Sequence, residues 1–206
     1  RIFGRSSARI VDLGCGNGRY LIGSALARPD SDHLGMDLVQ RAIDFAAHRA
    51  NARGLRNVRF VTADANVWLF ERLTESSIDE IHVYHPQPYY EASEISQRML
   101  TPEFLDRVWR VLRPDGLLVL QTDNKAYWKY LLGAVERDFD PERLPGPWPD
   151  APQGRTRREI LARKKGLVIW RMVARRREAP RAITAVKPDF DANRPGFKRG
   201  RSRRKN

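Results

Sequence analysis

Cysteine is almost absent from this sequence, in which Cys15 is the single example among 206 residues. One cysteine excludes a disulfide within the chain and fits a reducing compartment, so we expect a cytoplasmic protein. Long apolar runs are also lacking. No stretch of 18 apolar residues occurs, so we expect no transmembrane helix and no membrane partner. Because the first residue is Arg1 rather than Met, we expect that a further segment precedes it.

Residues that bind metals are few and scattered. The four histidines, at positions 33, 48, 82 and 85, and the lone cysteine show none of the paired spacings that are typical of zinc sites. We therefore expect no metal. No internal repeat is present, and the length is that of one domain.

The first 162 residues have no excess of either charge, since they hold 22 Lys and Arg and 22 Asp and Glu. Residues 163–206 hold 16 basic and 3 acidic residues, so the whole net charge of +13 lies there. A segment such as FKRGRSRRKN has too few apolar residues to fold, and basic segments of this kind bind phosphate backbones. The alternatives are a solubilising tail and a localisation signal. We predict a folded domain over residues 1–174 and a basic, disordered tail over residues 175–206.

What the chain does contain is a regular alternation of apolar runs and segments with helical periodicity. Strands are predicted at residues 9–13, 33–38, 57–62, 78–84, 117–122 and 166–173. Helices are predicted at residues 19–27, 41–52, 67–73, 102–112 and 125–136, with a proline-rich loop at 141–152. This alternation predicts an α/β fold with a parallel sheet and helices on both faces. Ligands of such sheets bind beyond the carboxyl ends of the strands.

Acidic residues and glycines follow the first three predicted strands. The first strand leads into Asp12-Leu-Gly14-Cys-Gly16-Asn-Gly, where glycines permit a tight turn and close approach of a ligand. This loop resembles motif I of the S-adenosyl-L-methionine (SAM) methyltransferases. Asp37 ends the second strand and Asp64 follows the third, where each carboxylate can bind a nucleoside. The alternatives are glycines that serve only the turn and acids that cap the following helices.

The fourth and fifth strands lead into two further polar segments. The fourth ends in YHPQPYY, residues 84–90, whose two prolines and three aromatic residues stop the strand. The fifth ends in Gln-Thr-Asp123-Asn, and we expect Asp123 to point towards the same mouth. The alternatives are a rigid turn at residues 84–90 and an Asp123 that caps the helix starting at Lys125.

Taken together, the segments from Ile10 to Trp170 are similar to the bacterial tRNA (guanine-N7)-methyltransferases. The glycine loop, GMDL, TADA, the fourth-strand segment, TPEFLDRVWRVLRPDG, LLVLQTD and TRRE occur in the order of that family. The resemblance implies a Rossmann-like class I SAM-dependent methyltransferase with a mostly parallel seven-stranded sheet. It also implies SAM as cofactor, a guanine of the tRNA variable loop as substrate, and a monomer or homodimer.

The resemblance also implies a set of site residues. Cofactor binding is expected of Asp12, Gly14, Gly16, Asp37, Asp64 and Gln87. A catalytic role is expected of Asp123 and Gln87, and tRNA guanine binding of Asp123, Thr156 and Glu159. Guanine N7 presents a lone pair in neutral RNA, so the enzyme needs alignment rather than a general base. A nearby carboxylate such as Asp123 then stabilises the cationic product.

Three positions depart from the family pattern. Gln87 replaces the aspartate of its P-D-P-W segment, Glu91 replaces a lysine, and Arg158 replaces an aromatic residue. Two alternative functions therefore stay open. One is a non-catalytic or re-purposed RNA-binding homologue, and the other is a methyltransferase that acts on a different substrate.

Overall fold

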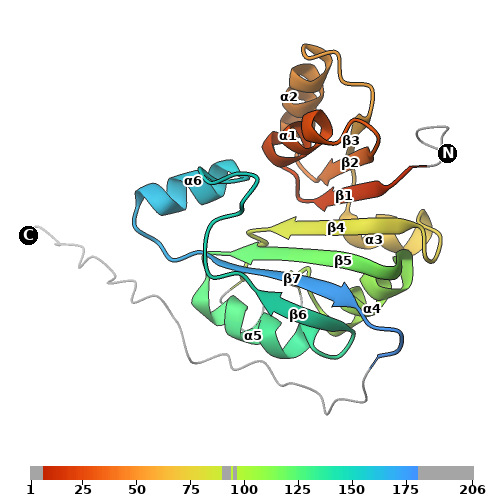
Figure 1. The fold of residues 1–206 in the computed structure, drawn as a ribbon, viewed down its shortest axis with the longest axis vertical. Coiled ribbons are helices and arrows are strands. Elements are labelled where there is room, and N and C mark those ends of the chain that lie inside the picture. The colour runs from red at the N-terminus through yellow and green to blue at the C-terminus, as the bar shows by residue number, and fades with distance from the viewer. Residues whose placement is uncertain (1–6, 90–93, 95–96, 181–206) are drawn as a thin grey trace, which may run out of the picture.

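A seven-stranded sheet runs through the structure, a computed structural model that describes residues 7–89, 94 and 97–180 (Figure 1). The strand order is β3-β2-β1-β4-β5-β7-β6. The strands are β1 (Arg9–Leu13), β2 (Asp32–Asp37), β3 (Val58–Thr62), β4 (Ile78–Tyr84), β5 (Leu112–Thr122), β6 (Phe139–Arg143) and β7 (Trp170–Arg176). The helices are α1 (Arg19–Ala27), α2 (Gln40–Asn51), α3 (Ala65–Glu71), α4 (Pro102–Val111), α5 (Lys125–Val135) and α6 (Arg157–Lys164).

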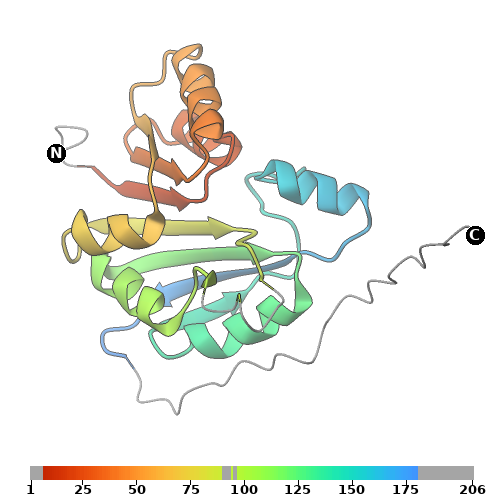
Figure 2. The ribbon, with the colours of Figure 1, turned by 180° about the vertical axis from the view of Figure 1, so that it is seen from behind.

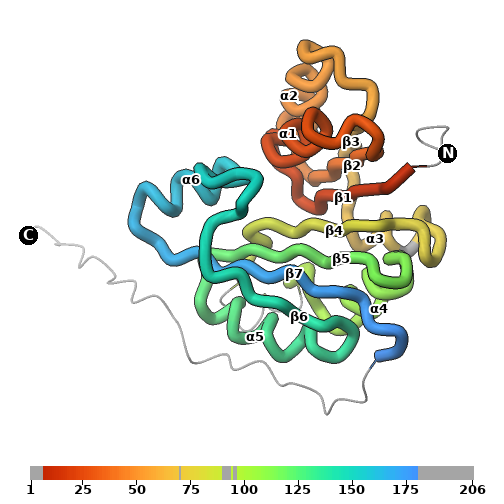
Figure 3. The backbone as a smooth tube through the Cα atoms, viewed as in Figure 1, coloured from red at the N-terminus to blue at the C-terminus, as the bar shows by residue number. Residues whose placement is uncertain are grey.

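The pairing of the strands confirms the predicted α/β class and the mostly parallel sheet. Strands β1 to β5 pair in parallel, whereas β7 runs antiparallel to both β5 and β6. The chain steps outward from β1 to β3 and then returns to place β4 on the other side of β1. This reversal is a topological switch point, and the loops after β1 and β4 therefore open beside one another. The backbone trace shows α6 at this same edge of the sheet (Figure 3).

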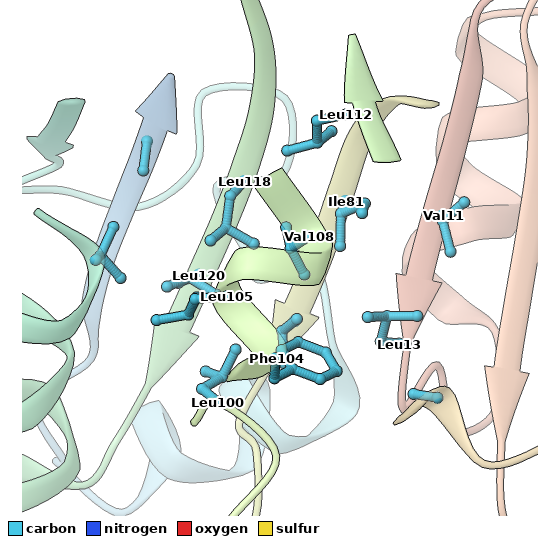
Figure 4. Packing of buried hydrophobic residues seen from close by; sticks show 14 of the residues in the cluster. Val11, Leu13, Ile81, Leu100, Phe104, Leu105, Val108, Leu112, Leu118 and Leu120 are labelled. Carbon is cyan, nitrogen blue, oxygen red and sulfur yellow. The ribbon is translucent and has the colours of Figure 1, made fainter. Parts of the chain in front are cut away.

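Apolar side chains bury both faces of the sheet. In the view from behind, α3, α4 and α5 lie in front of the strands (Figure 2). On that face Phe104, Leu105 and Val108 of α4 pack over Ile81 and Leu118 (Figure 4). On the other face, a second cluster joins α1 to β1, β4 and β5 and includes Tyr20, Leu21, Ile10, Tyr84, Val119 and Trp148.

The helix start predicted at residue 102 is confirmed, together with its cap. Thr101 is the N-cap of α4, and its hydroxyl accepts the Phe104 N–H at 3.2 Å. Pro102 occupies the first turn, where a missing N–H costs nothing because that group has no partner within the helix.

Four elements differ from the sequence-based prediction. Strand β5 begins at Leu112 rather than at residue 117, because Leu112 already pairs with Ile78 of β4. Strand β6 lies at the start of the segment predicted as a proline-rich loop, and it contains Pro141. Because β6 is the edge strand of the sheet, proline is tolerated there. Helix α6 was not predicted, although Thr156 and Glu159 have the spacing of a capping box. The last strand lies at Trp170–Arg176, so the domain boundary drawn at residue 174 falls inside it. Residues 181–206, most of the predicted tail, lie outside the described residues.

None of the helices in the described part of the chain combines the length and apolarity that a bilayer crossing requires.

Gly18→Ala is expected to destabilise the fold, because Gly18 has a φ of +69° and an added Cβ would lie 2.8 Å from the Ala46 Cβ. The loss should be about 1–3 kcal/mol in urea unfolding. Gly23→Ala is the matched control, since Gly23 lies in α1 with nothing within 4 Å of an added Cβ. It should stabilise by about 0.5–1 kcal/mol. A Gly18→Ala protein as stable as Gly23→Ala would contradict this packing.

Candidate active site

A cavity of about 260 Å³ opens at the switch point, between the loop after β1 and the start of α6. Its lining comprises Asp12, Gly14, Cys15, Gly16, Asn17, Arg19, Tyr20, Tyr84, Thr156, Arg157 and Arg158. Gly14 and Gly16 have φ values of +77° and +52°, and an added Cβ at either would meet no atom within 4 Å. Their open side leaves backbone accessible to a ligand. A larger cavity of about 770 Å³ lies against α1 and the face of β4 and β5. Its strand residues come mostly from the middle of the strands rather than from their carboxyl ends.

Asp12 brings a buried carboxylate to this cavity. Its side chain is 2% exposed, and its Oδ1 has no hydrogen-bond partner among the described residues. Burial raises the pKa of Asp12 to about 8, with a further increase from Asp37 and an opposing effect of Arg155. A buried carboxyl oxygen without a partner is costly unless a ligand completes it. The ammonium of SAM has the charge and the N–H donors that this oxygen lacks, so the residues present fit this cofactor.

Asp37 ties the glycine-rich loop to β2. Its Oδ2 accepts the Gly16 N–H at 2.8 Å, and its Oδ1 accepts the Val39 N–H at 3.0 Å. The N-cap of α2 is Val39, so the alternative that Asp37 itself occupies the cap position is wrong. Each carboxylate oxygen has two lone pairs, so Asp37 can still accept from a ligand. Its role towards a ribose stays a prediction.

Asp64 and Gln87 lie outside the lining of the cavity. Asp64 is the exposed N-cap of α3 and accepts the Asn66 N–H at 2.7 Å, as the alternative reading of this acid expected. Gln87 is exposed on the segment after β4. Arg98 holds that segment by donating to the carbonyls of Pro88 and Tyr89 at 2.6 and 2.8 Å. The cofactor and catalytic roles of Asp64 and Gln87 stay predictions.

Asp123 lies at the end of β5 and is bound on both carboxylate oxygens. Its Oδ1 lies 3.0 Å from His85 Nδ1, and its Oδ2 accepts from Nε and Nη2 of Arg158 at 3.1 and 2.8 Å. Burial alone would raise the pKa of Asp123, but the hydrogen bonds from His85 and Arg158 outweigh it and hold this pKa well below its usual range. The N-cap of α5 is Asn124, so the alternative that Asp123 caps this helix is wrong.

A buried polar network is linked to Asp123 through His85. Its centre is Gln121, whose side-chain nitrogen lies 2.8 Å from His85 Nε2 and donates to Glu159 Oε2 at 3.2 Å. Its side-chain oxygen accepts from the indole N–H of Trp148 and from Nε of Arg171 at 3.2 Å. These groups come from β5, β7, α6 and the loops after β4 and β6, so the network holds the mouth of the site together.

Thr156 and Glu159 both form hydrogen bonds within the protein that hold α6 in place. Thr156 is the N-cap of α6 and accepts the Glu159 N–H at 3.1 Å, and it lines the cavity. Glu159 is fully buried, and its carboxylate accepts from Arg171 at 2.5 Å and from the Arg155 N–H at 2.9 Å. Removing one partner of such a buried pair typically costs 3–5 kcal/mol. Their contact with a tRNA guanine stays a prediction, and Glu159 reaches no solvent from which a guanine could approach it.

Sequence reasoning missed three residues of this site. His85 was considered only as a metal ligand, Gln121 was treated as part of a strand end, and Arg155 was given no role. Arg155 donates to the Tyr84 hydroxyl at 2.8 Å and lies 3.9 Å over the Trp148 ring. The available signal was position, because both His85 and Gln121 stand at the carboxyl ends of neighbouring central strands.

Within residues 7–89, 94 and 97–180, no group of three or more His, Cys, Asp and Glu side chains could hold a metal ion.

Several of the solved structures that share this fold are named as methyltransferases. A predicted O-methyltransferase from Agrobacterium tumefaciens superposes with a TM-score of 0.57 at 16% identity, covering 85% of this chain and 77% of its own. The geranyl diphosphate C-methyltransferase from Streptomyces coelicolor, solved with S-adenosyl-L-homocysteine, superposes with a TM-score of 0.54 at 15% identity, covering 84% and 72%. At this identity the likeness shows the class I methyltransferase fold.

The sequence matches curated proteins over most of its length. A tRNA (guanine-N(7)-)-methyltransferase from Alkalilimnicola ehrlichii is 30% identical over 183 residues, which cover 87% of this chain and 77% of that protein. A protein of the same name from Halorhodospira halophila is 30% identical over 180 residues, covering 85% and 78%. A family model described as "Putative methyltransferase" matches residues 6–172. The chain therefore belongs to this family of methyltransferases.

Proposed function

We propose that this chain transfers the methyl group of SAM to N7 of a guanine in the variable loop of tRNA. The proposal is supported by relatives of that name that match 85% or more of the chain. It is carried by one structural observation, the pair of carboxylates at the strand ends. Asp12 is buried in the lining of the cavity without a partner for its Oδ1. Asp123 follows β5, pairs with Arg158 of the same lining, and has a strongly lowered pKa.

Asp12 and the glycine-rich loop would hold the cofactor. When bound, SAM supplies a methyl group on a positively charged sulfur, which a nucleophile can attack directly. The carboxylate of Asp12 would pair with the ammonium of the cofactor, and this pairing would compensate the cost of burying it. The backbone at Gly14 and Gly16 leaves room for the methionine portion.

Asp123 would bind the guanine and stabilise the charge that methylation creates. A guanine presents N1–H and an exocyclic amino group on its Watson–Crick edge, and an ionised carboxylate accepts from both. Adenine has an acceptor at N1, so it would leave the carboxylate poorly paired. N7 lies on the other side of the purine and is free to face the methyl group. The lowered pKa of Asp123 keeps it ionised at neutral pH, so it opposes the positive charge of the product.

Arg158 covers the position that a guanine would use. Its Nε and Nη2 both donate to Asp123 Oδ2, and its side chain is 64% exposed. A guanidinium and the guanine edge present similar pairs of N–H donors. The incoming base would therefore displace Arg158, whose exposed position makes this displacement cheap. Glu91, another departure from the family pattern, lies outside the described residues.

Methyl transfer from labelled SAM to tRNA is expected to require N7 of the variable-loop guanine. The test compares unmodified tRNA with tRNA that carries 7-deazaguanine at that position, in which a C–H group replaces N7 and the Watson–Crick edge is unchanged. Label should appear on the first tRNA only, and a tRNA with adenine there should also stay unlabelled. Equal label on all three tRNAs would contradict the proposed reaction.

Asp12→Asn is expected to weaken SAM binding by about 10- to 100-fold, the range of a hydrogen bond to a charged group. The same change should stabilise the unliganded protein. The folded chain retains the Asp12 proton up to about pH 8, whereas the unfolded chain releases it near the ordinary pKa of 3.8. The stability of the unliganded wild type therefore falls as the pH rises from about 4 to about 8.

Calorimetry with SAM and urea unfolding at pH 4 and pH 8 measure the two effects. The Asn variant should gain stability over the wild type at pH 8 and little at pH 4. Asp64→Asn is the matched control, since Asn caps a helix as well as Asp does and Asp64 is exposed. Unchanged SAM affinity in Asp12→Asn would remove Asp12 from the cofactor site.

Arg158→Ala is expected to lower the KM for tRNA about two- to fivefold relative to Arg157→Ala, the effect of breaking one exposed ion pair. Both variants lose one exposed positive charge at the start of α6, but only Arg158 forms an ion pair with Asp123. Steady-state kinetics at fixed salt compare the two. A higher KM in Arg158→Ala than in Arg157→Ala would show that Arg158 binds the RNA rather than competing with it.

A further inference from the structure

His85 is held in one orientation by its backbone and by both ring nitrogens. It follows β4 with a φ of +53°, and its backbone N–H donates to the Gln121 carbonyl at 2.7 Å. Its side chain is only 6% exposed. Nδ1 lies 3.0 Å from Asp123 Oδ1, and Nε2 lies 2.8 Å from the side-chain nitrogen of Gln121. The ring therefore bridges the buried network and the carboxylate at the mouth.

The orientation of the Gln121 amide is fixed by neighbours whose chemistry leaves one choice. Trp148 and Arg171 are obligate donors, so the group that faces them is the amide oxygen. The Glu159 carboxylate is an acceptor, so the group that faces it at 3.2 Å is the NH₂. A reversed amide would set donors against donors and an oxygen against the carboxylate. The NH₂ of Gln121 therefore also points at His85.

This orientation determines which nitrogen of His85 carries the proton. Because Gln121 donates to Nε2, that nitrogen accepts and carries no hydrogen. The proton is then on Nδ1, from which it is donated to Asp123 Oδ1. With Oδ1 engaged, Oδ2 is the oxygen turned towards the exposed Arg158 and the mouth.

We propose that His85 is a positioning residue for methyl transfer, set by Gln121 in its Nδ1–H form so that it holds Asp123 with Oδ2 presented to the substrate. This inference rests on the proposed function, in which Asp123 contacts the guanine. A neutral imidazole orients the carboxylate without adding a positive charge of its own. The negative charge of Asp123 thus stays available, and no reorientation is needed when the base arrives.

The first experiment reads the tautomer directly. The full chain is prepared with ¹⁵N-labelled histidine, and long-range ¹H–¹⁵N spectra are recorded at neutral pH without SAM or RNA. The resonances of His85 are assigned from their loss in His85→Asn. We expect the nitrogen shifts of a neutral ring protonated at Nδ1. A ring protonated at Nε2, or at both nitrogens, would overturn the proposal.

The second experiment separates positioning from a merely structural role. His85→Phe keeps an aromatic ring but removes both hydrogen bonds, and we expect kcat to fall about 10- to 100-fold. His85→Asn is the matched variant, because its amide nitrogen can take the place of Nδ1 and Asn tolerates positive φ. It should recover at least a third of the wild-type kcat. Both should bind SAM within about twofold of the wild type.

A double-mutant cycle with Asp123→Asn completes this test. If His85 acts through Asp123, His85→Phe should reduce kcat less than threefold in the Asp123→Asn background. Losses that multiply, or a folded His85→Asn as slow as His85→Phe, would overturn the proposal. If the wild type fails to methylate tRNA, the proposed function fails while the nitrogen spectra still decide the tautomer of His85. The spectra also decide it if His85→Phe does not fold.

Discussion

The buried amide of Gln121 is the interaction on which the mouth of this site depends. It accepts from Trp148 and Arg171 and lies within hydrogen-bonding distance of Glu159 and His85. These partners stand on separate elements, so the network joins α6 and the loops after β4 and β6 to the strands β5 and β7. A buried polar group that is fully paired is stabilising, whereas one lost partner would leave several groups unpaired in a region of low dielectric. The network therefore specifies a single arrangement of the site.

Two carboxylates at the same edge of the sheet have opposite electrostatic environments. Asp12 is buried with an oxygen that has no partner in the described chain, and burial raises its pKa. Asp123 is also largely buried, but His85 and Arg158 hold its pKa well below the usual range. The environment of Asp12 suits a residue that pairs with a cationic group of a ligand. That of Asp123 suits a residue that must already be ionised when the substrate enters. This division matches the proposed roles in cofactor and guanine binding.

The fold was predictable because strongly periodic segments alternate along the chain, and the boundaries of most helices lie within two residues of the prediction. The misses have local causes. Strand β6 contains a proline that only an edge position tolerates, and whether a strand lies at the edge is a property of the whole sheet. The strand predicted at residues 166–173 is shifted, because Leu167 and Val168 are exposed in spite of their apolar character. Helix α6 was not predicted, although Thr156 and Glu159 have the capping-box spacing that marks a helix start.

For the site, the sequence by itself determined that acids and glycines follow successive strands, and parallel topology then brings strand ends to one edge of the sheet. Asp12, Gly14 and Gly16 line the cavity, as that reasoning predicted. Asp123 does not line it but pairs with Arg158, which does, so its place at the mouth stays a prediction. Only the tertiary structure decided that Glu159 is buried against Arg171 and that Asp64 is an exposed helix N-cap. It also decided that Gln121 contacts His85, which in turn contacts Asp123. The physical reason is that a hydrogen bond depends on distance and direction between groups far apart in the chain, and strand order alone carries neither.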